Sequence, residues 1–260
     1  MRRIIILQFM LILLVAGAAS AVDPSLVAWY KFDESSGTTA YDSARSHTGT
    51  ISGATWATGR VGGALRFDGV NDRVSSPDAL DLDITGDITI AAWVNFFQGG
   101  LGYDGSEKAI VTKTVYNGAF NNPYNFRTSI STNPNLAFVR ANASDHECAF
   151  SDLYISLNTW HHVAVREENG AANFYVDGVL TGMWWGVPPL TSPPTGNDYS
   201  LLIGARYDGL FFNGLIDDVR IYNRALSSAE IRAIPEPCTL MLLGLGSVIA
   251  ARLPKRRIEG

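Results

Sequence analysis

The chain has 260 residues, of which 47% are hydrophobic and 17% are charged, and its formal net charge is −5. This length and apolar content suit one globular domain with a short segment at each end. Positions 1–21 and 235–260 hold six of the 20 basic residues but only two of the 25 acidic ones, so the part between them is strongly acidic. An acidic domain without a basic stripe argues against nucleic acid as a partner.

The N-terminal segment has the layout of a secretory signal. Arg2 and Arg3 precede the apolar run Ile4–Val15, and Ala19-Ser20-Ala21 fits the small-residue rule for cleavage. We therefore predict a signal peptide over residues 1–21, helical in its apolar part, which signal peptidase removes. A retained membrane anchor is the alternative, but the apolar run is short for a membrane span.

The body between the two ends is a series of short apolar stretches separated by turns. Apolar residues alternate with others over Asp87–Phe96, and Glu168-Asn169-Gly170 is a turn between two further stretches. Strands are expected at Leu26–Phe32, Gly62–Phe67, from Val74, Asp87–Phe96, Lys108–Thr114, Tyr124–Ile130, Asn135–Arg140, Trp160–Arg166, Ala172–Val176, Val179-Leu180, Ser200–Ala205 and Gly214–Tyr222. Ser227 and Glu230 have capping-box spacing, which predicts one short helix after them. Many short strands predict an all-β sandwich or jelly roll.

The last of these strands, Gly214–Tyr222, carries an unexpected acid. Strand alternation places Asp217 on the same face as Val219 and Ile221, and Asp218 on the opposite face, where we expect it at the surface. A carboxylate on a core-facing row is unfavourable unless it is paired, hydrogen-bonded or bound to a metal.

Three partners for Asp217 stay open at this point. Calcium prefers carboxylate and carbonyl oxygens, and Asp68 in its Asp-Gly turn, together with Asp33, would supply them if the first and last strands are neighbours. A salt bridge to Arg66 or Arg73 is the second possibility. The third is a hydrogen bond to a turn.

The C-terminal segment has a distinctive order. It begins with Pro235-Glu236-Pro237, continues with the apolar stretch Thr239–Ala251 and ends in the basic cluster Arg252–Arg257. A hydrophobic helix of this length covers roughly 20 Å, less than the ~30 Å hydrocarbon core of a membrane. The order resembles the PEP-CTERM sorting signal of exported bacterial proteins. The resemblance implies that residues 235–260 anchor the protein transiently and that an exosortase-type protease removes them, leaving the body at the cell envelope or in an extracellular matrix.

The body itself resembles a known family. It contains, in order, ALRFDGVNDRV, ITIAAWVNF, NTWHHVAVREENGAANFYVDGVL and LLIGARYDG…FNGLIDDVRIYNRALSSAEI. Together these look like the LamG-like jelly-roll domain of the concanavalin A-like lectin/glucanase superfamily, over roughly Ser25–Ala233. The resemblance implies a two-sheet antiparallel jelly roll, and we assign residues 22–234 to this domain.

The superfamily includes glucanases, so catalytic carboxylates are the first site to look for. These enzymes resemble one another in carrying two or three acids at alternate positions of one strand, which points them at one substrate. No expected strand here has that pattern. Asp217 and Asp218 are expected on opposite faces, and Asp81 and Asp83 lie in a turn-like stretch.

The histidines do not suggest another reaction. His161 and His162 are adjacent in an expected strand and would face opposite sides, and no spacing supports a Ser-His-Asp triad or a zinc site. The trio His146-Glu147-Cys148 is consecutive and is not expected to converge on a metal. We therefore predict that the protein is not an enzyme.

Glycan binding is the function that the resemblance implies. Aromatic rings at the surface can stack on sugar faces, and asparagines can supply hydrogen bonds. The candidates are Trp184, Trp185, Tyr103, Tyr116, Tyr124, Asn121 and Asn122. Neighbouring tryptophans of a strand split between its faces, so at most one is expected to be a platform, and packing under Pro188-Pro189 is the alternative. We expect a non-catalytic protein that binds a glycan or an extracellular matrix polymer. A structural or adhesive protein without a sugar site is the alternative, and a glycoside-acting enzyme is third.

Overall fold

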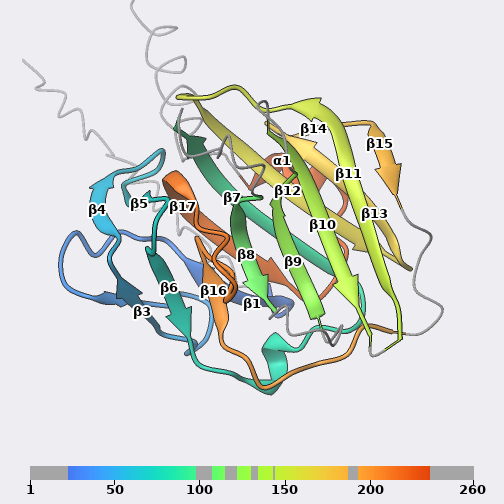
Figure 1. The fold of residues 1–260 in the computed structure, drawn as a ribbon, viewed down its shortest axis with the longest axis horizontal. Helices are drawn as coiled ribbons and strands as arrows, with labels where there is room; N and C mark the ends of the chain where they lie inside the picture. Colours follow the sequence, from blue (N-terminus) through green and yellow to red (C-terminus); the bar gives the residue numbers. More distant parts are fainter. Residues whose placement is uncertain are drawn as a thin grey trace, which may run out of the picture.

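A computed structural model describes residues 23–97, 107–114, 122–129, 134–142, 144–186 and 193–234, without the side chains of Trp184 and Trp185. These residues form two antiparallel sheets packed face to face (Figure 1), so the all-β sandwich predicted from the sequence is confirmed. Within the described ranges, no helix is long and apolar enough to cross a membrane.

The first sheet has the strand order β14-β13-β12-β7-β17-β5-β4, and β1 also pairs with β17. Its strands are β1 (Leu26–Tyr30), β4 (Thr55–Thr58), β5 (Gly63–Asp68), β7 (Ile88–Phe96), β12 (Trp160–Glu168), β13 (Ala171–Val176), β14 (Val179–Leu180) and β17 (Asn213–Tyr222).

The second sheet has the order β15-β11-β10-β9-β8-β16-β6-β3-β2. Its strands are β2 (Thr39–Ala40), β3 (Gly49–Ser52), β6 (Arg73–Ser76), β8 (Ala109–Lys113), β9 (Asn122–Thr128), β10 (Asn135–Ala141), β11 (His146–Tyr154), β15 (Met183–Gly186) and β16 (Leu201–Ile203). A 3-10 turn spans Leu80–Leu82.

The main core lies between the sheets and follows from strand alternation. In β7, the predicted inward row contains Ile90 and Val94, both fully buried in this core. The neighbouring residue Trp93 points to the outer face of the first sheet, because Ala92 and Val94 on either side of it belong to the core, and it shares that face with its cross-strand partner His162. Side chains that do not belong to the main core, such as Trp93 and His162, therefore lie on the outer face of this sheet.

A short helix, α1 (Ser228–Ala233), covers one half of that outer face. The predicted capping box is present, since the Ser227 side chain accepts from the Glu230 N–H and the Glu230 side chain accepts from the Ser227 N–H. Ile231 of the helix packs with Ala91 and Tyr222 in a second apolar cluster. The half that carries Trp93 and His162 lies outside this cluster.

A β-bulge in β17 overturns the predicted facing of its acids. The register against β7 shifts between Asp217 and Arg220, and Asp218 has a φ of 49°. The extra residue reverses the alternation, so Val219 stays in the core while Asp217 pairs with Trp93 and points outward. Asp217 is therefore not on the core row.

Asp218 is also placed differently from the prediction. It is buried, with 5% exposure, and its carboxylate accepts from Trp29 Nε1 and pairs with Arg220 on the outer face. The two acids therefore lie on the same side of the sheet, and the argument that they point to opposite faces is wrong.

Candidate functional site

The bulge coincides with a break in the edge of the first sheet. One side of β17 pairs with β5 as far as Ile216 and with β1 from Val219 onward. The space beside β17 between the end of β1 and the start of β5 is occupied by residues 59–62. They form a tight turn, closed by a hydrogen bond of 3.0 Å from the Gly59 N–H to the Gly62 carbonyl oxygen. We call residues 59–62 the gap turn.

The Asp217 carboxylate fixes the position of the gap turn by hydrogen bonds. Its Oδ2 accepts hydrogen bonds from the backbone N–H groups of Arg60, at 2.8 Å, and Val61, at 2.9 Å. Its Oδ1 is buried without a hydrogen-bond partner. Burial, aided by the nearby negative charge of Asp218, raises the pKa of Asp217 to about 7. The hydrogen bond to a turn, one of the three partners left open by the sequence, is therefore present.

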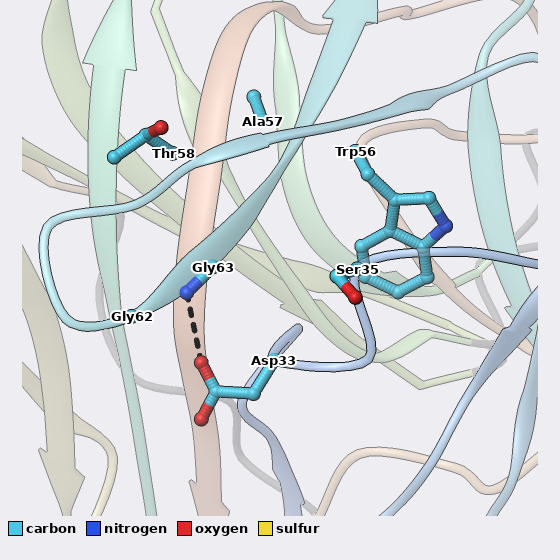
Figure 2. Close-up of a pocket in the computed structure, with 7 residues that line it drawn as sticks. All are labelled: Asp33, Ser35, Trp56, Ala57, Thr58, Gly62 and Gly63. Atoms are coloured by element: carbon cyan, nitrogen blue, oxygen red, sulfur yellow. Dashed lines mark hydrogen bonds between the residues drawn. The ribbon is translucent and has the colours of Figure 1, made fainter.

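The Asp33 carboxylate fixes the chain where it leaves the gap turn, at Gly63. Its Oδ1 accepts from the Gly63 N–H at 2.8 Å, as Figure 2 shows. Gly62 has a φ of +73°, and a Cβ there would lie 2.2 Å from Asp33 Oδ1, so glycine is required for this approach. Phe32 and Ser35, on either side of the Asp33 segment, have φ values of 57° and 62°. Such conformations are rare for residues with side chains and are frequent at functional sites.

These residues border a hollow of about 650 Å³, which we call the Trp56 hollow. It is lined by Asp33, Ser35, Trp56, Ala57, Thr58, Gly62 and Gly63. In Figure 2, strand β4 carries Trp56 and Thr58 across the hollow from the segment that carries Asp33.

The Trp56 ring is fixed in place. Its Nε1 donates to the Gly37 carbonyl oxygen at 2.9 Å, and the ring packs against the edge of the main core. The hollow thus combines a rigid aromatic surface with an exposed carboxylate at Asp33 and hydroxyls at Ser35 and Thr58. An apolar surface with a few convergent polar groups is the usual composition of a small-ligand site.

The three acids predicted to share calcium do not converge. Asp33 and Asp217 lie on two sides of the gap turn. Asp68 pairs in register with Asn213, four residues from Asp217 along β17, and accepts from the Val70 N–H of its own turn. The described residues contain no group of three or more His, Cys, Asp or Glu side chains placed to hold a metal. The three side chains are therefore not placed to share one ion, and calcium binding itself stays a prediction.

The two arginines proposed as partners of Asp217 are engaged elsewhere. Arg66 lies over the Phe97 ring, 5.6 Å from its centroid. Arg73 donates to the Asn71 carbonyl oxygen at 3.3 Å. Neither forms the predicted salt bridge.

Among the predicted glycan-binding residues, the structure describes the side chains of Tyr124 and Asn122, and both are buried. Tyr124 is fully buried in the main core, where its ring cannot serve as a platform for a sugar. Asn122 is buried at the start of β9. Trp184 and Trp185 lie in the edge strand β15, but their side chains are outside the described part. Tyr103, Tyr116, Asn121, both end segments and the sorting motif Pro235-Glu236-Pro237 are also outside the described residues.

A hydrogen-bonded chain of three side chains, Ser156, His161 and Asp177, was not predicted from the sequence. The Ser156 hydroxyl oxygen lies 2.7 Å from His161 Nε2, and His161 Nδ1 lies 2.8 Å from Asp177 Oδ2. Ser156 and His161 lie on either side of the turn that opens β12, and Asp177 follows β13. Hairpin pairing of β12 with β13 brings the third residue to the other two, which spacing along the chain does not reveal.

The Trp56 hollow was also missed. Trp56 lies in the short strand Thr55–Thr58, within a stretch rich in Gly, Ser and Thr that favours loop. Trp56 and Ala57 are adjacent between Thr55 and Thr58, which is not the alternation of a half-buried strand, so the residues gave no clear strand signal.

Comparison with solved structures gives the same fold. Domain 4 of AbnA, a GH43 extracellular arabinanase from Geobacillus stearothermophilus, solved in complex with arabinotriose, is 21% identical with a TM-score of 0.59, over 82% of this chain and 98% of that one. Trypanosoma rangeli sialidase is 17% identical with a TM-score of 0.60, over 82% of this chain but only 33% of the sialidase. The binding domain of Paraclostridial Mosquitocidal Protein 1 is 17% identical with a TM-score of 0.60, over 81% of this chain and 52% of that one.

No curated protein matches the chain. The family described as the concanavalin A-like lectin/glucanases superfamily matches residues 67–232, which is more than half of the sequence. The two-sheet architecture, the ordered motifs and this match agree, and the chain belongs to the concanavalin A-like lectin/glucanases superfamily.

Proposed function

We propose that the protein binds carbohydrate in the Trp56 hollow without modifying it. The observation that carries the proposal is the fixed tryptophan facing an exposed carboxylate across a hollow of about 650 Å³. A sugar ring has an apolar face that packs on an aromatic ring and hydroxyls that bond to carboxylate and hydroxyl groups at its edge.

Two further points support a binding role. Glycoside hydrolases of the common kind use two carboxyl groups about 5–10 Å apart in a cleft. Among the described residues that line the hollow, Asp33 is the one acid, and Asp217 has no exposed surface beneath the gap turn. The arabinanase domain with the same fold was solved with arabinotriose, which makes oligosaccharides of neutral sugars a reasonable first panel.

The test is a glycan panel followed by titration calorimetry on Trp56→Ala and Asp33→Asn. We expect each variant to lose at least about tenfold in affinity, which corresponds to about 1.4 kcal/mol. Tyr154→Ala is the matched control, because Tyr154 is an exposed aromatic residue of the second sheet. Unchanged affinity in Trp56→Ala would overturn the assignment of the site, and a panel without any bound glycan would favour the structural or adhesive alternative.

We also propose that the domain is exported and displayed at the cell envelope or in an extracellular matrix. The support is the signal-like N-terminal segment and the resemblance of the tail to a sorting signal. Mass spectrometry of the protein recovered from its host tests both ends. We expect a chain that begins at Val22 and lacks the basic cluster, and recovery of full-length chain in the cytoplasm would contradict this.

The chain Ser156–His161–Asp177 favours a second candidate function, hydrolysis of an ester on a bound glycan. Its hydrogen-bond order is that of a serine hydrolase. Ser156 Oγ would bond to the ester carbonyl carbon while His161 Nε2 takes its proton and passes it to the departing alcohol. Water would then release the acid and restore the serine. This candidate ranks second because the Asp177 side chain is 50% exposed, and water weakens hydrogen bonds that are not shielded.

An aryl acetate substrate and a fluorophosphonate probe test this candidate. Hydrolysis and labelling that both disappear in Ser156→Ala would support it. A wild-type protein that neither hydrolyses the ester nor takes the label would exclude it.

A further inference from the structure

A second hollow lies at the other side of the gap turn, and we call it the Arg60 hollow. It has a volume of about 440 Å³ and is lined by Arg60, Trp93, Thr159, Trp160 and Asp177. Its floor is the outer face of β7 and β12, in the half of the sheet that lies outside the α1 cluster. Two tryptophans, one cation and one carboxylate therefore meet in one concave surface.

The cation of this hollow is available to a ligand. The Arg60 guanidinium lies over the Trp93 ring, 5.0 Å from its centroid. Within the described part of the chain, no carboxylate lies within ion-pair distance of it, although the protein as a whole is acidic. A guanidinium stacked on a ring keeps its N–H groups at the edge free for a planar anion such as a carboxylate.

The position of Arg60 is set by the structure beneath it. Its backbone N–H donates to Asp217, so the gap turn cannot move without breaking that bond. A fixed backbone and a stacked side chain lower the entropy lost when an anion binds. The Arg60 guanidinium is therefore preorganised to bind an anion, unlike that of an arginine on a free loop.

The floor beside Arg60 contains polar atoms without partners. Trp93 has 6% exposure, and its Nε1 has no hydrogen-bond partner. The same holds for both ring nitrogens of its neighbour His162 and for Oδ1 of Asn95, the cross-strand partner of Trp160. Buried polar side-chain atoms nearly always have a partner, so a cluster of exceptions indicates a site where water or a ligand supplies one.

The carboxylate at the opposite rim is held in a fixed orientation. Asp177 Oδ1 accepts from the His162 N–H at 2.9 Å, and Oδ2 lies 2.8 Å from His161 Nδ1. Ser156 in turn holds His161 through its Nε2. Each carboxylate oxygen keeps a free lone pair, so Asp177 can accept from a ligand hydroxyl.

We infer that the Arg60 hollow is a binding subsite for a carboxylate-bearing sugar, such as a uronic acid unit of an acidic polysaccharide. The Arg60 guanidinium donates two hydrogen bonds to the carboxylate, and the half-buried Trp160 packs on the sugar ring. Asp177 accepts from the sugar hydroxyls, and the Thr159 hydroxyl bonds to them as donor or acceptor. The inference rests on the proposed carbohydrate-binding function but on different residues, and it adds charge selectivity to it.

The test measures binding of oligogalacturonate and of a neutral arabino-oligosaccharide to the full mature protein, by calorimetry at low and high salt. We expect the acidic oligosaccharide to bind, with affinity falling as salt rises because the contact is ionic. Arg60→Gln should weaken binding of the acidic oligosaccharide at least tenfold and remove most of its salt dependence. The affinity of Arg60→Lys should lie between those of the wild type and Arg60→Gln, because lysine keeps the charge but lacks the two parallel N–H donors of a guanidinium. Trp160→Ala should also weaken it.

Arg73→Gln is the matched control, since Arg73 is an exposed arginine away from both hollows. Failure of the wild type to bind the acidic oligosaccharide, or equal binding by Arg60→Gln, would overturn the inference. Trp56→Ala separates the two proposals. If neutral sugars bind and depend on Trp56 while Arg60→Gln has no effect, the proposed function stands and the acidic subsite falls.

Discussion

The buried acid Asp217 should make the stability of the protein depend on pH in an unusual direction. Its pKa is raised from 3.8 to about 7, chiefly by burial. Below pH 3.8 the group is protonated in both the folded and the unfolded state. Between pH 3.8 and 7 only the unfolded chain ionises, which favours unfolding, so stability falls as pH rises. Above pH 7 both states are ionised and the loss is complete.

The size of this effect follows from the shift. One pKa unit corresponds to about 1.4 kcal/mol, so the whole window amounts to on the order of 4 kcal/mol. Asp217→Asn keeps an acceptor oxygen for the Arg60 and Val61 N–H groups but cannot ionise. We expect the variant and the wild type to be about equally stable at pH 4. At pH 8 the variant should be more stable by at least about 1.5 kcal/mol.

Urea denaturation at each pH unit from 4 to 8 measures this difference. Asp33→Asn is the matched control, because Asp33 accepts a hydrogen bond at the end of the same turn but is exposed. We expect the difference in unfolding free energy between this variant and the wild type to stay constant within about 0.5 kcal/mol over the pH range. Parallel curves for Asp217→Asn and the wild type would refute the reasoning. A variant less stable at pH 8 would show that the charged carboxylate has a favourable partner, such as a cation.

Three other predictions test neighbouring parts of the account. Gly62→Ala should weaken glycan binding, because its Cβ would displace Asp33. Gly209→Ala is the control, because Gly209 also has a positive φ (+101°) but its Cβ would make only an ordinary contact away from the hollow, and calorimetry compares the two variants. Tyr124→Phe should raise the melting temperature, because the Tyr124 hydroxyl is buried without a partner and its removal gains about 1 kcal/mol. If a structural calcium is bound, EDTA should lower the melting temperature and added calcium should restore it, and an unchanged melting temperature would contradict the predicted calcium.

The fold could largely be predicted because its signals are local. Strand alternation in Ile88–Phe96, the hairpin turn at Asn169-Gly170 and the capping box at Ser227 each depend on residues close in sequence. The strands Gly49–Ser52 and Thr55–Thr58 were missed because each is only four residues long and the Gly and Ser residues around them indicate loop, although Thr, Ile and Trp within them favour strands. Gly49–Ser52 pairs with Arg73–Ser76, which is more than twenty residues away, whereas Thr55–Thr58 forms a hairpin with the next strand, Gly63–Asp68.

The site could be predicted only in part. The oddity of Asp217 was visible in the sequence, but its cause was not, since one bulge residue reverses the alternation and nothing in GLIDDVRIY specifies where it falls. Asp33 was found because it follows the first strand. Trp56, Arg60 and Trp160 are brought to the two hollows by the gap turn and by pairing between strands. These contacts join residues that are far apart in the sequence, so no local residue pattern predicts them.

A crystal structure of the mature protein with its best-bound oligosaccharide tests the central claim most directly. We expect a sugar ring packed on the Trp56 indole, with a hydroxyl within hydrogen-bond distance of the Asp33 carboxylate. A sugar bound instead on the outer face of the second sheet, with the Trp56 hollow filled only by water, would contradict it.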